Sequence, residues 1–150
     1  MFTKLAQKPE AVEIMSLYVA FLRSLYQLLQ NAHWKSKGPE FYGKHLLFER
    51  LYTATAETAD SAAEKCIGVF GELDSCTEII AELCEKFDAK HFDDDFIQST
   101  LKAEQMFLAF SQTIYDQLKE MKAITLGLDD LILSIASQHE VHVYLLKQSL

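Results

Sequence analysis

Glycine and proline are scarce in this chain. Its 150 residues include only 5 glycines and 2 prolines, which argues against a fold of many short strands joined by tight turns. Hydrophobic residues make up 49% of the sequence, and a chain of this length can bury one substantial core. We therefore expect a single domain, residues 1–150, built from long continuous helices.

Long apolar runs, paired cysteines and an excess of positive charge are also missing. The most apolar stretch, residues 15–29, is interrupted by Arg23 and is near the lower length limit of a membrane span. The N-terminal residues lack the apolar core of a secretory signal. Cys66, Cys76 and Cys84 form no CxxC pair, which favours reduced thiols. The sequence predicts a cytoplasmic protein without a membrane partner, and its formal charge of −8 should attract cations.

In the first half of the chain, apolar residues recur every three or four positions along two segments, as on one face of a helix. The first segment covers residues 10–33, and Gly38-Pro39 cannot continue it. The second runs from Glu40 to Phe70, where Gly71 ends it. These patterns predict two long helices that are joined by a short turn.

The second half contains two more such segments after a long connection. A short amphipathic helix is expected within residues 73–87 of that connection. The aspartates at 93–95 offer an N-cap to the third helix, and we expect Gly127 to end it before a fourth helix at 128–146. Four helices, with a long crossover between the second and third, are the ferritin-like topology. The predicted fold class is an all-α, ferritin-like four-helix bundle with a short extra helix in the connection between helices 2 and 3.

Ionisable residues among the apolar positions of the first two helices are candidate metal ligands. His33 ends the first helix, and His45, Glu49, Asp60 and Glu64 lie on the second. Around that helix, Asp60 is about 60° and Glu64 about 100° from His45. Along the helix axis, however, His45 and Asp60 are about 22 Å apart at 1.5 Å per residue. One chain cannot place both residues on one metal ion.

Two interpretations of this pattern remain open. The residues could be unrelated polar groups on an amphipathic helix. Alternatively, a second copy of the helix could pack antiparallel about a two-fold axis near Thr53, which would bring His45 beside Asp60 and Glu64 of its partner. Carboxylates at i and i+4 can chelate one cation together, and imidazole combined with carboxylate suits iron.

The spacing of these residues resembles the pattern of the Dps miniferritins. That pattern has a His-Trp pair, a glycine, an aromatic residue and a second histidine, followed by an aspartate and a glutamate. This sequence matches it at His33, Trp34, Gly38, Phe41, His45, Asp60 and Glu64. Residues 130–146 are similar to the fourth helix of the family. The resemblance covers nearly the whole chain and implies a single ferritin-like Dps domain.

The resemblance implies a homo-oligomer, a shell of twelve subunits with 23 symmetry and a ferroxidase centre at each two-fold interface. The catalytic ligands would be His33 and His45 from one subunit and Asp60 and Glu64 from its neighbour. Glu49 would be a further metal ligand. The centre, with one or two irons, would oxidise Fe(II) with hydrogen peroxide or, more slowly, dioxygen. The product would be stored as a ferric oxyhydroxide mineral, which protects against oxidative damage.

The resemblance also implies roles outside the ligand set. Trp34 is an auxiliary residue that would intercept oxidising intermediates, although packing at an interface would explain it as well. Asp129 and Asp130 are candidates for an acidic pore through which iron enters. The alternative for this pair is an interaction of helix N-terminal acids with the macrodipole.

The remaining histidines do not favour another metal site. No glutamate is followed by a histidine three residues later, as in the di-iron sites within ferritin-like bundles, which argues against a site inside the bundle. His139 and His142 are three residues apart, whereas a metalloprotease helix needs four. We expect these two histidines to face solvent. Nothing suggests a ligand role for His91.

Two other function classes compete with the ferroxidase. One is a DNA-condensing module, but its basic tail is missing because only Lys4, Lys8 and Lys147 lie near the two ends. DNA binding is therefore not expected. The other is a purely structural assembly with vestigial ligands, which the complete ligand set argues against.

Overall fold

The fold consists of helices in the part of the chain that the structure describes. The structure is a computed structural model that describes the backbone of residues 2–150 and the side chains from residue 10 onward. Its elements are α1 (Phe2–Lys35), α2 (Phe41–Phe70), α3 (Thr77–Lys86), the short 3-10 helix η1 (Ala89–Phe92), α4 (Phe96–Glu120) and α5 (Leu126–Lys147). The predicted all-α class, with an extra short helix in the long connection, is confirmed.

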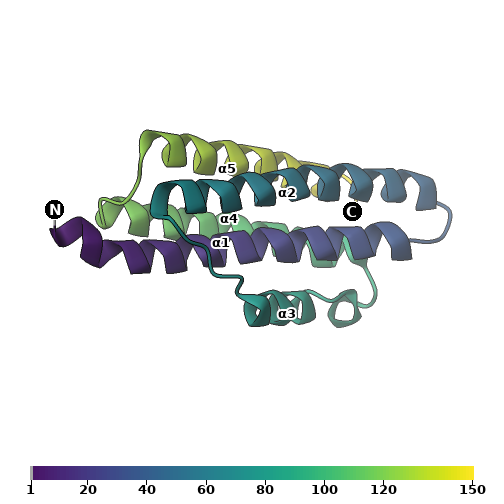
Figure 1. Cartoon of the computed structure of the whole chain (residues 1–150). Helices are drawn as coiled ribbons and strands as arrows, with labels where there is room; N and C mark the ends of the chain where they lie inside the picture. The colour runs from purple at the N-terminus through teal and green to yellow at the C-terminus, as the bar shows by residue number, and fades with distance from the viewer. Residues whose placement is uncertain (1) are drawn as a thin grey trace.

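The four long helices form two antiparallel pairs, α1 with α2 and α4 with α5 (Figure 1). The connection after α2 returns along the bundle, so that α2 and α4 run in the same direction. Within this connection, α3 packs on the outside of α1. One long crossover between two antiparallel pairs is the ferritin-like arrangement.

Three of the predicted helix boundaries have a clear local cause. Gly38 adopts a φ of 100° in the turn before α2, and Gly71 adopts a φ of 91° as it closes that helix. Both conformations are in the left-handed region, where glycine carries no steric cost. Asp95 caps α4 by accepting a hydrogen bond from the Gln98 amide at 3.1 Å.

The boundary between the last two helices differs from the prediction that Gly127 ends the third helix. The chain leaves α4 at Glu120, and Lys122 takes the positive φ of 56° that turns it. Thr125 then accepts a hydrogen bond from the Leu128 amide and starts α5. Gly127 lies within the first turn of that helix, because a hydroxyl N-cap determines where α5 begins.

The first helix lies at the centre of the packing. Tyr18 on α1 stacks on Phe107 of α4 at a centroid distance of 5.3 Å, and Phe21 meets the same ring edge-on at 5.4 Å. By length and composition, Glu10–Lys35 could cross a membrane, but 67% of its most apolar window is buried inside the bundle. Lys4 and Lys8, two of the few basic residues near the ends of the chain, have side chains outside the described residues.

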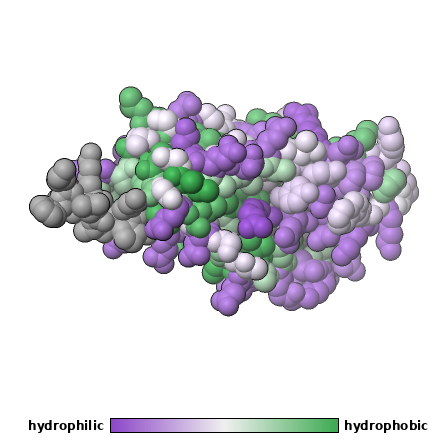
Figure 2. Space-filling view, in the orientation of Figure 1, coloured by the Kyte–Doolittle hydropathy of each residue, from purple (hydrophilic) through white to green (hydrophobic). Residues whose placement is uncertain are grey.

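The surface is divided between apolar and polar regions. In Figure 2, hydrophobic surface gathers beside the start of α1, whereas hydrophilic residues cover most of the opposite end.

The three cysteines are free; Cys66 is buried, and Cys76 and Cys84 are half-buried. Burial, together with the nearby Glu72 charge, raises the pKa of the Cys66 thiol to about 11. This thiol is therefore protonated and unreactive at neutral pH.

Candidate metal centres

The two predicted histidine ligands lie in direct contact at one end of the α1–α2 pair. His33 comes from the last turn of α1 and His45 from the start of α2. Their rings stack at a centroid distance of 3.7 Å with an interplanar angle of 17°. His33 is buried and His45 half-buried. The short Gly38-Pro39 turn between the helices brings the two rings together.

Reciprocal hydrogen bonds fix the orientation of both rings. Nδ1 of His33 lies 2.7 Å from the backbone oxygen of His45, and Nδ1 of His45 lies 2.8 Å from that of His33. A carbonyl oxygen only accepts, so each Nδ1 must carry the proton and donate it. In the neutral ring, the lone pair then belongs to Nε2, which is the nitrogen left for a metal ion.

The predicted carboxylates lie farther along α2, and all of them are exposed. Glu49 is one turn beyond His45, and Asp60 and Glu64 follow near the other end of the helix. Asp60 lines a groove of about 410 Å³ between α1 and α2. The α2 wall of this groove consists of small side chains at Ala56, Ala59 and Ala63. Small residues allow another element to approach the carboxylate closely.

The single chain does not bring the predicted ligands together. Among the side chains described from residue 10 onward, the only group of three or more possible ligands whose donor atoms lie within 4.8 Å is elsewhere in the bundle. Within one subunit, His33 and His45 therefore form no such group with Glu49, Asp60 or Glu64. A centre shared with Asp60 and Glu64 of a partner stays a prediction.

The auxiliary residue and the pore candidates occupy different surroundings. Trp34 is 63% exposed at the end of α1, next to His33. Asp129 is half-buried in the first turn of α5 and accepts a hydrogen bond from the Tyr115 hydroxyl at 2.7 Å. This bond raises the pKa of Tyr115, because it holds the phenol in its protonated form. Asp130 is exposed.

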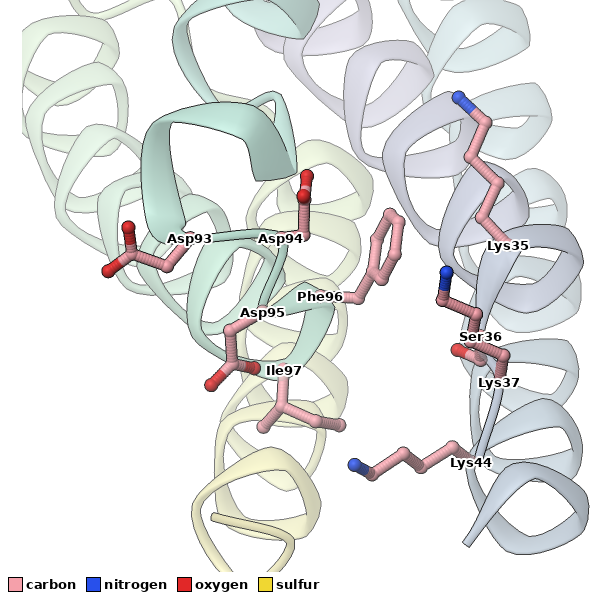
Figure 3. Close-up of a pocket in the computed structure, with 9 residues that line it drawn as sticks. All are labelled: Lys35, Ser36, Lys37, Lys44, Asp93, Asp94, Asp95, Phe96 and Ile97. Atoms are coloured by element: carbon pink, nitrogen blue, oxygen red, sulfur yellow. The ribbon is translucent and has the colours of Figure 1, made fainter. Parts of the chain in front are cut away.

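A cleft of about 610 Å³ lies between the α1–α2 turn and the segment before α4. Figure 3 shows basic side chains on one wall and acidic side chains on the other. The basic wall carries Lys35, Lys37 and Lys44, and the acidic wall carries Asp93, Asp94 and Asp95. A lining of both signs suits neither a free cation nor a phosphate. The cleft contains none of the predicted metal ligands.

A second group of possible ligands is buried inside the bundle. Glu104 on α4 is 0% exposed, and His139 and His142 on α5 are 0% and 3% exposed. Nδ1 of His139 lies 2.6 Å from Glu104 Oε2, and Nδ1 of His142 lies 3.1 Å from Oε1. The prediction that His139 and His142 face solvent was wrong. The expectation that no metal site lies inside the bundle rested on the spacing of a glutamate and a histidine on one helix, and this cluster joins two helices.

The sequence contains a signal for this cluster that the motif search missed. His139 and His142 continue the stripe of Ile132, Ile135 and Leu146, which are all buried. Glu104 takes a position in the corresponding stripe of α4, between Leu101 and Phe107. A charged residue within an apolar stripe at helical spacing has to be buried with a partner. The periodicity of each helix could have indicated that these residues are buried. It could not have indicated that Glu104 on α4 is the hydrogen-bond partner of the histidines on α5.

Comparisons with known proteins show which proteins this chain resembles. No family model matches the chain. The chain is 27% identical over 145 residues to "DNA protection during starvation protein 2" of Bacillus anthracis, which covers 92% of this chain and 94% of the relative. DpsC from Streptomyces coelicolor has a similar structure, with a TM-score of 0.82 and 21% identity, over 99% of this chain and 86% of that one.

Another solved structure has the same fold. The Dps protein of Vibrio cholerae, described as a member of a broad superfamily of ferritin-like diiron-carboxylate proteins, matches with a TM-score of 0.79 and 19% identity. The match covers 95% of this chain and 90% of that one. Likeness at this identity establishes the fold, and the sequence relative carries the Dps name itself. The predicted resemblance to the Dps miniferritins is thus confirmed, and the chain has the ferritin-like fold.

Proposed function

We propose that the protein is a ferroxidase and an iron store that works as a cytoplasmic cage of twelve copies of one domain. Fe(II) is its substrate, and hydrogen peroxide or dioxygen is the oxidant. The similarity to Dps proteins and to the diiron-carboxylate superfamily supports a role in iron binding and in protection during starvation. Protection of DNA would then follow from the removal of iron and peroxide, and would require no contact with DNA.

One observation carries this proposal: the reciprocal hydrogen bonds between His33 and His45. They keep Nδ1 of each ring protonated and leave both Nε2 lone pairs free for an incoming ion. Metal-bound histidines usually have their second nitrogen held in this way, by a carbonyl or a carboxylate. The ring positions are also fixed by stacking, so no side-chain ordering is needed when Fe(II) binds.

The carboxylates would come from a second copy of the chain. Asp60 and Glu64 lie one helical turn apart and are exposed, as ligands for a partner's ion must be. A two-fold axis through the middle of α2 would place them beside the partner's imidazoles. The alanine-lined groove next to Asp60 leaves room for this approach. Glu49, one turn from His45, would supply a further oxygen ligand from the subunit that carries the histidines.

The ligand types suit the oxidation of iron. Carboxylate oxygens are hard donors that bind Fe(III) more strongly than Fe(II), so they favour the loss of an electron. Two Fe(II) ions would give one electron each to one hydrogen peroxide molecule. Together with two protons, these electrons break the O–O bond and form two water molecules, and no hydroxyl radical is released. The Fe(III) formed would hydrolyse and be stored as a ferric oxyhydroxide.

A test compares Asp60→Asn with the unmodified protein. Anaerobic protein is mixed with Fe(II), peroxide is added, and ferric absorbance is followed against a protein-free control. Asp60→Asn keeps the size of the side chain but removes its charge, and should slow oxidation at least about tenfold. Asp116→Asn on α4 is the matched control, because Asp116 is also exposed and lies outside the predicted centre. Unmodified protein that oxidises iron no faster than buffer would contradict the proposal.

A further inference from the structure

The buried cluster of Glu104, His139 and His142 has the composition of a metal site. Each residue offers a donor atom within 4.8 Å of the others. Two imidazoles and one carboxylate are the protein ligands of some catalytic zinc ions and of mononuclear non-haem Fe(II). We propose that this cluster binds one first-row divalent cation, such as Zn(II) or Fe(II), inside each subunit between α4 and α5. The inference does not depend on the proposed centre between subunits.

The donor atoms already lie close to positions around a single ion. The two separations between Nδ1 and the Glu104 oxygens are 2.6 and 3.1 Å. Around a tetrahedral ion with bonds of about 2.1 Å, neighbouring ligand atoms are about 3.4 Å apart. Each side chain would therefore move by less than about 1 Å to admit the ion. The i, i+3 spacing of the histidines places both rings on the same face of α5.

The hydrogen bonding of His139 permits its Nδ1 to change from a hydrogen-bond donor to a metal ligand. Without a metal ion, its Nδ1 donates to Glu104, and its Nε2 is buried without any hydrogen-bond partner. A cation on Nδ1 requires the proton of the neutral ring to move to Nε2. The change gives up the hydrogen bond from Nδ1 to Glu104, which coordination of one ion by both groups would replace, and it breaks no bond at Nε2. His33 differs, because its Nδ1 proton is needed for the bond that orients the ring.

The charge of the cluster favours a cation as well. Glu104 is the only buried carboxylate among the side chains of residues 10–150, and no lysine or arginine is buried with it. Its two oxygens each lie within hydrogen-bonding distance of one imidazole, Oε2 of His139 and Oε1 of His142. A carboxylate buried as an anion needs a compensating charge, which a divalent ion supplies.

The burial of all three ligands indicates a resident ion rather than a substrate. Asp60 and Glu64 of the predicted interface centre are exposed and can exchange iron, whereas Glu104, His139 and His142 are 0–3% exposed. In the described part of the chain, α1 and α2 add no histidine, cysteine or carboxylate to the group. The site therefore holds one ion, in contrast to the two-metal sites of other ferritin-like bundles. The bound ion would cross-link α4 to α5 and so stabilise their contact.

Cobalt retention tests the site. The full chain carrying Asp60→Asn and Glu64→Gln, which removes the carboxylates of the predicted interface centre, is produced in medium with added Co(II). A chelator then strips exposed metal. About one Co(II) per chain should remain, with imidazole scattering in its X-ray absorption spectrum. Adding Glu104→Gln or His142→Gln should lower the retained cobalt at least about tenfold. Glu140→Gln, exposed on the same helix, is the matched control and should keep it.

Three results would overturn the proposal. The first is a parent protein that retains no cobalt after chelation. The second is retention that Glu104→Gln and His142→Gln leave unchanged. The third, which needs neither variant to fold, is retained cobalt whose spectrum shows no imidazole. Iron oxidation is impaired in the parent whatever the core binds, so this measurement and the ferroxidase assay can fail independently.

Discussion

His33 and His45 hold each other's rings, because Nδ1 of each donates to the backbone carbonyl of the other at 2.7 and 2.8 Å. The pair closes the junction of α1 and α2 and presents two unprotonated nitrogens at the same place. In the proposed centre, this structural contact would also supply a preformed half of the ligand set. The two roles can be separated, since replacing one ring removes a ligand but leaves both backbone carbonyls.

We first predict that His45→Ala lowers the rate of Fe(II) oxidation at least about tenfold. The change removes one of the two imidazole ligands of the proposed centre and the hydrogen bond that its ring donates to the His33 carbonyl. The assay is the ferric absorbance measurement with peroxide. His91→Ala is the control, because His91 is exposed and pairs only with Glu85. If both variants lose activity equally, His45 is not a ligand. Circular dichroism should show that His45→Ala keeps its helices.

Second, two inactive variants should restore activity when they assemble together. One chain carries His33→Ala and His45→Ala, and the other carries Asp60→Asn and Glu64→Gln. In a shared centre, a mixed pair has one complete site and one that lacks both histidines, Asp60 and Glu64. Random pairing of equal amounts makes half of the pairs mixed, so about a quarter of the unmodified activity is expected. Co-assembly without any recovery would show that the ligands do not come from different subunits.

Third, Glu104 should make the stability of the protein depend on acid pH. Burial raises its pKa, but the charges and hydrogen bonds of the two histidines outweigh burial and hold the pKa in the folded state below the usual range of a glutamate. Its stabilising effect is therefore complete above that usual range and is lost as the pH falls through the folded pKa. Urea unfolding of chelator-treated protein should show a weaker acid dependence in Glu104→Gln. At neutral pH, Glu104→Ala should lose about 3–5 kcal/mol, because it leaves two buried histidines without their acceptor. Glu140→Gln should match the unmodified protein in both respects.

Fourth, Asp130 should contribute more to iron entry than Asp129. The Asp129 carboxylate already accepts the Tyr115 hydroxyl, whereas Asp130 is exposed. Asp130→Asn is expected to slow iron uptake severalfold at low ionic strength, and added salt should reduce the difference because it screens attraction of the cation. Initial uptake rates at low Fe(II) concentration measure this effect, with Asp116→Asn as the control. A larger effect of Asp129→Asn would assign the pore to the other acid.

Much of the fold could be predicted because its boundaries depend on local chemistry. Gly71 closes α2 through its own positive φ, and Asp95 caps α4 with its own carboxylate. The end of α4 could not be predicted in this way. Lys122 takes a left-handed conformation that its side chain does not favour, and Thr125 competed with Gly127 as the start of α5. The Thr125 hydroxyl caps the helix and so determines that α5 begins before Gly127.

The two candidate sites differ in how much of their residue contacts could be predicted from the sequence. His33 and His45 are twelve residues apart on either side of a tight turn, so spacing alone brings them near each other. Glu104 and His139 are 35 residues apart on separate helices. No local pattern relates them, and their contact appears only once the α4–α5 pair is assembled. The carboxylates of the proposed shared centre are harder still to predict, because they come from a second copy of the chain.

The separation of Glu104 from its histidines has a consequence for biosynthesis. The carboxylate leaves the ribosome 35 residues before His139 and 38 before His142. Until α5 is made, nothing in α4 can compensate the charge, so Glu104 keeps its hydration shell and the inner face of α4 stays wet. A chain that lacks α5 would therefore leave one ionised side chain on the inner face of α4, and this face could lose its water only once the last helix docks.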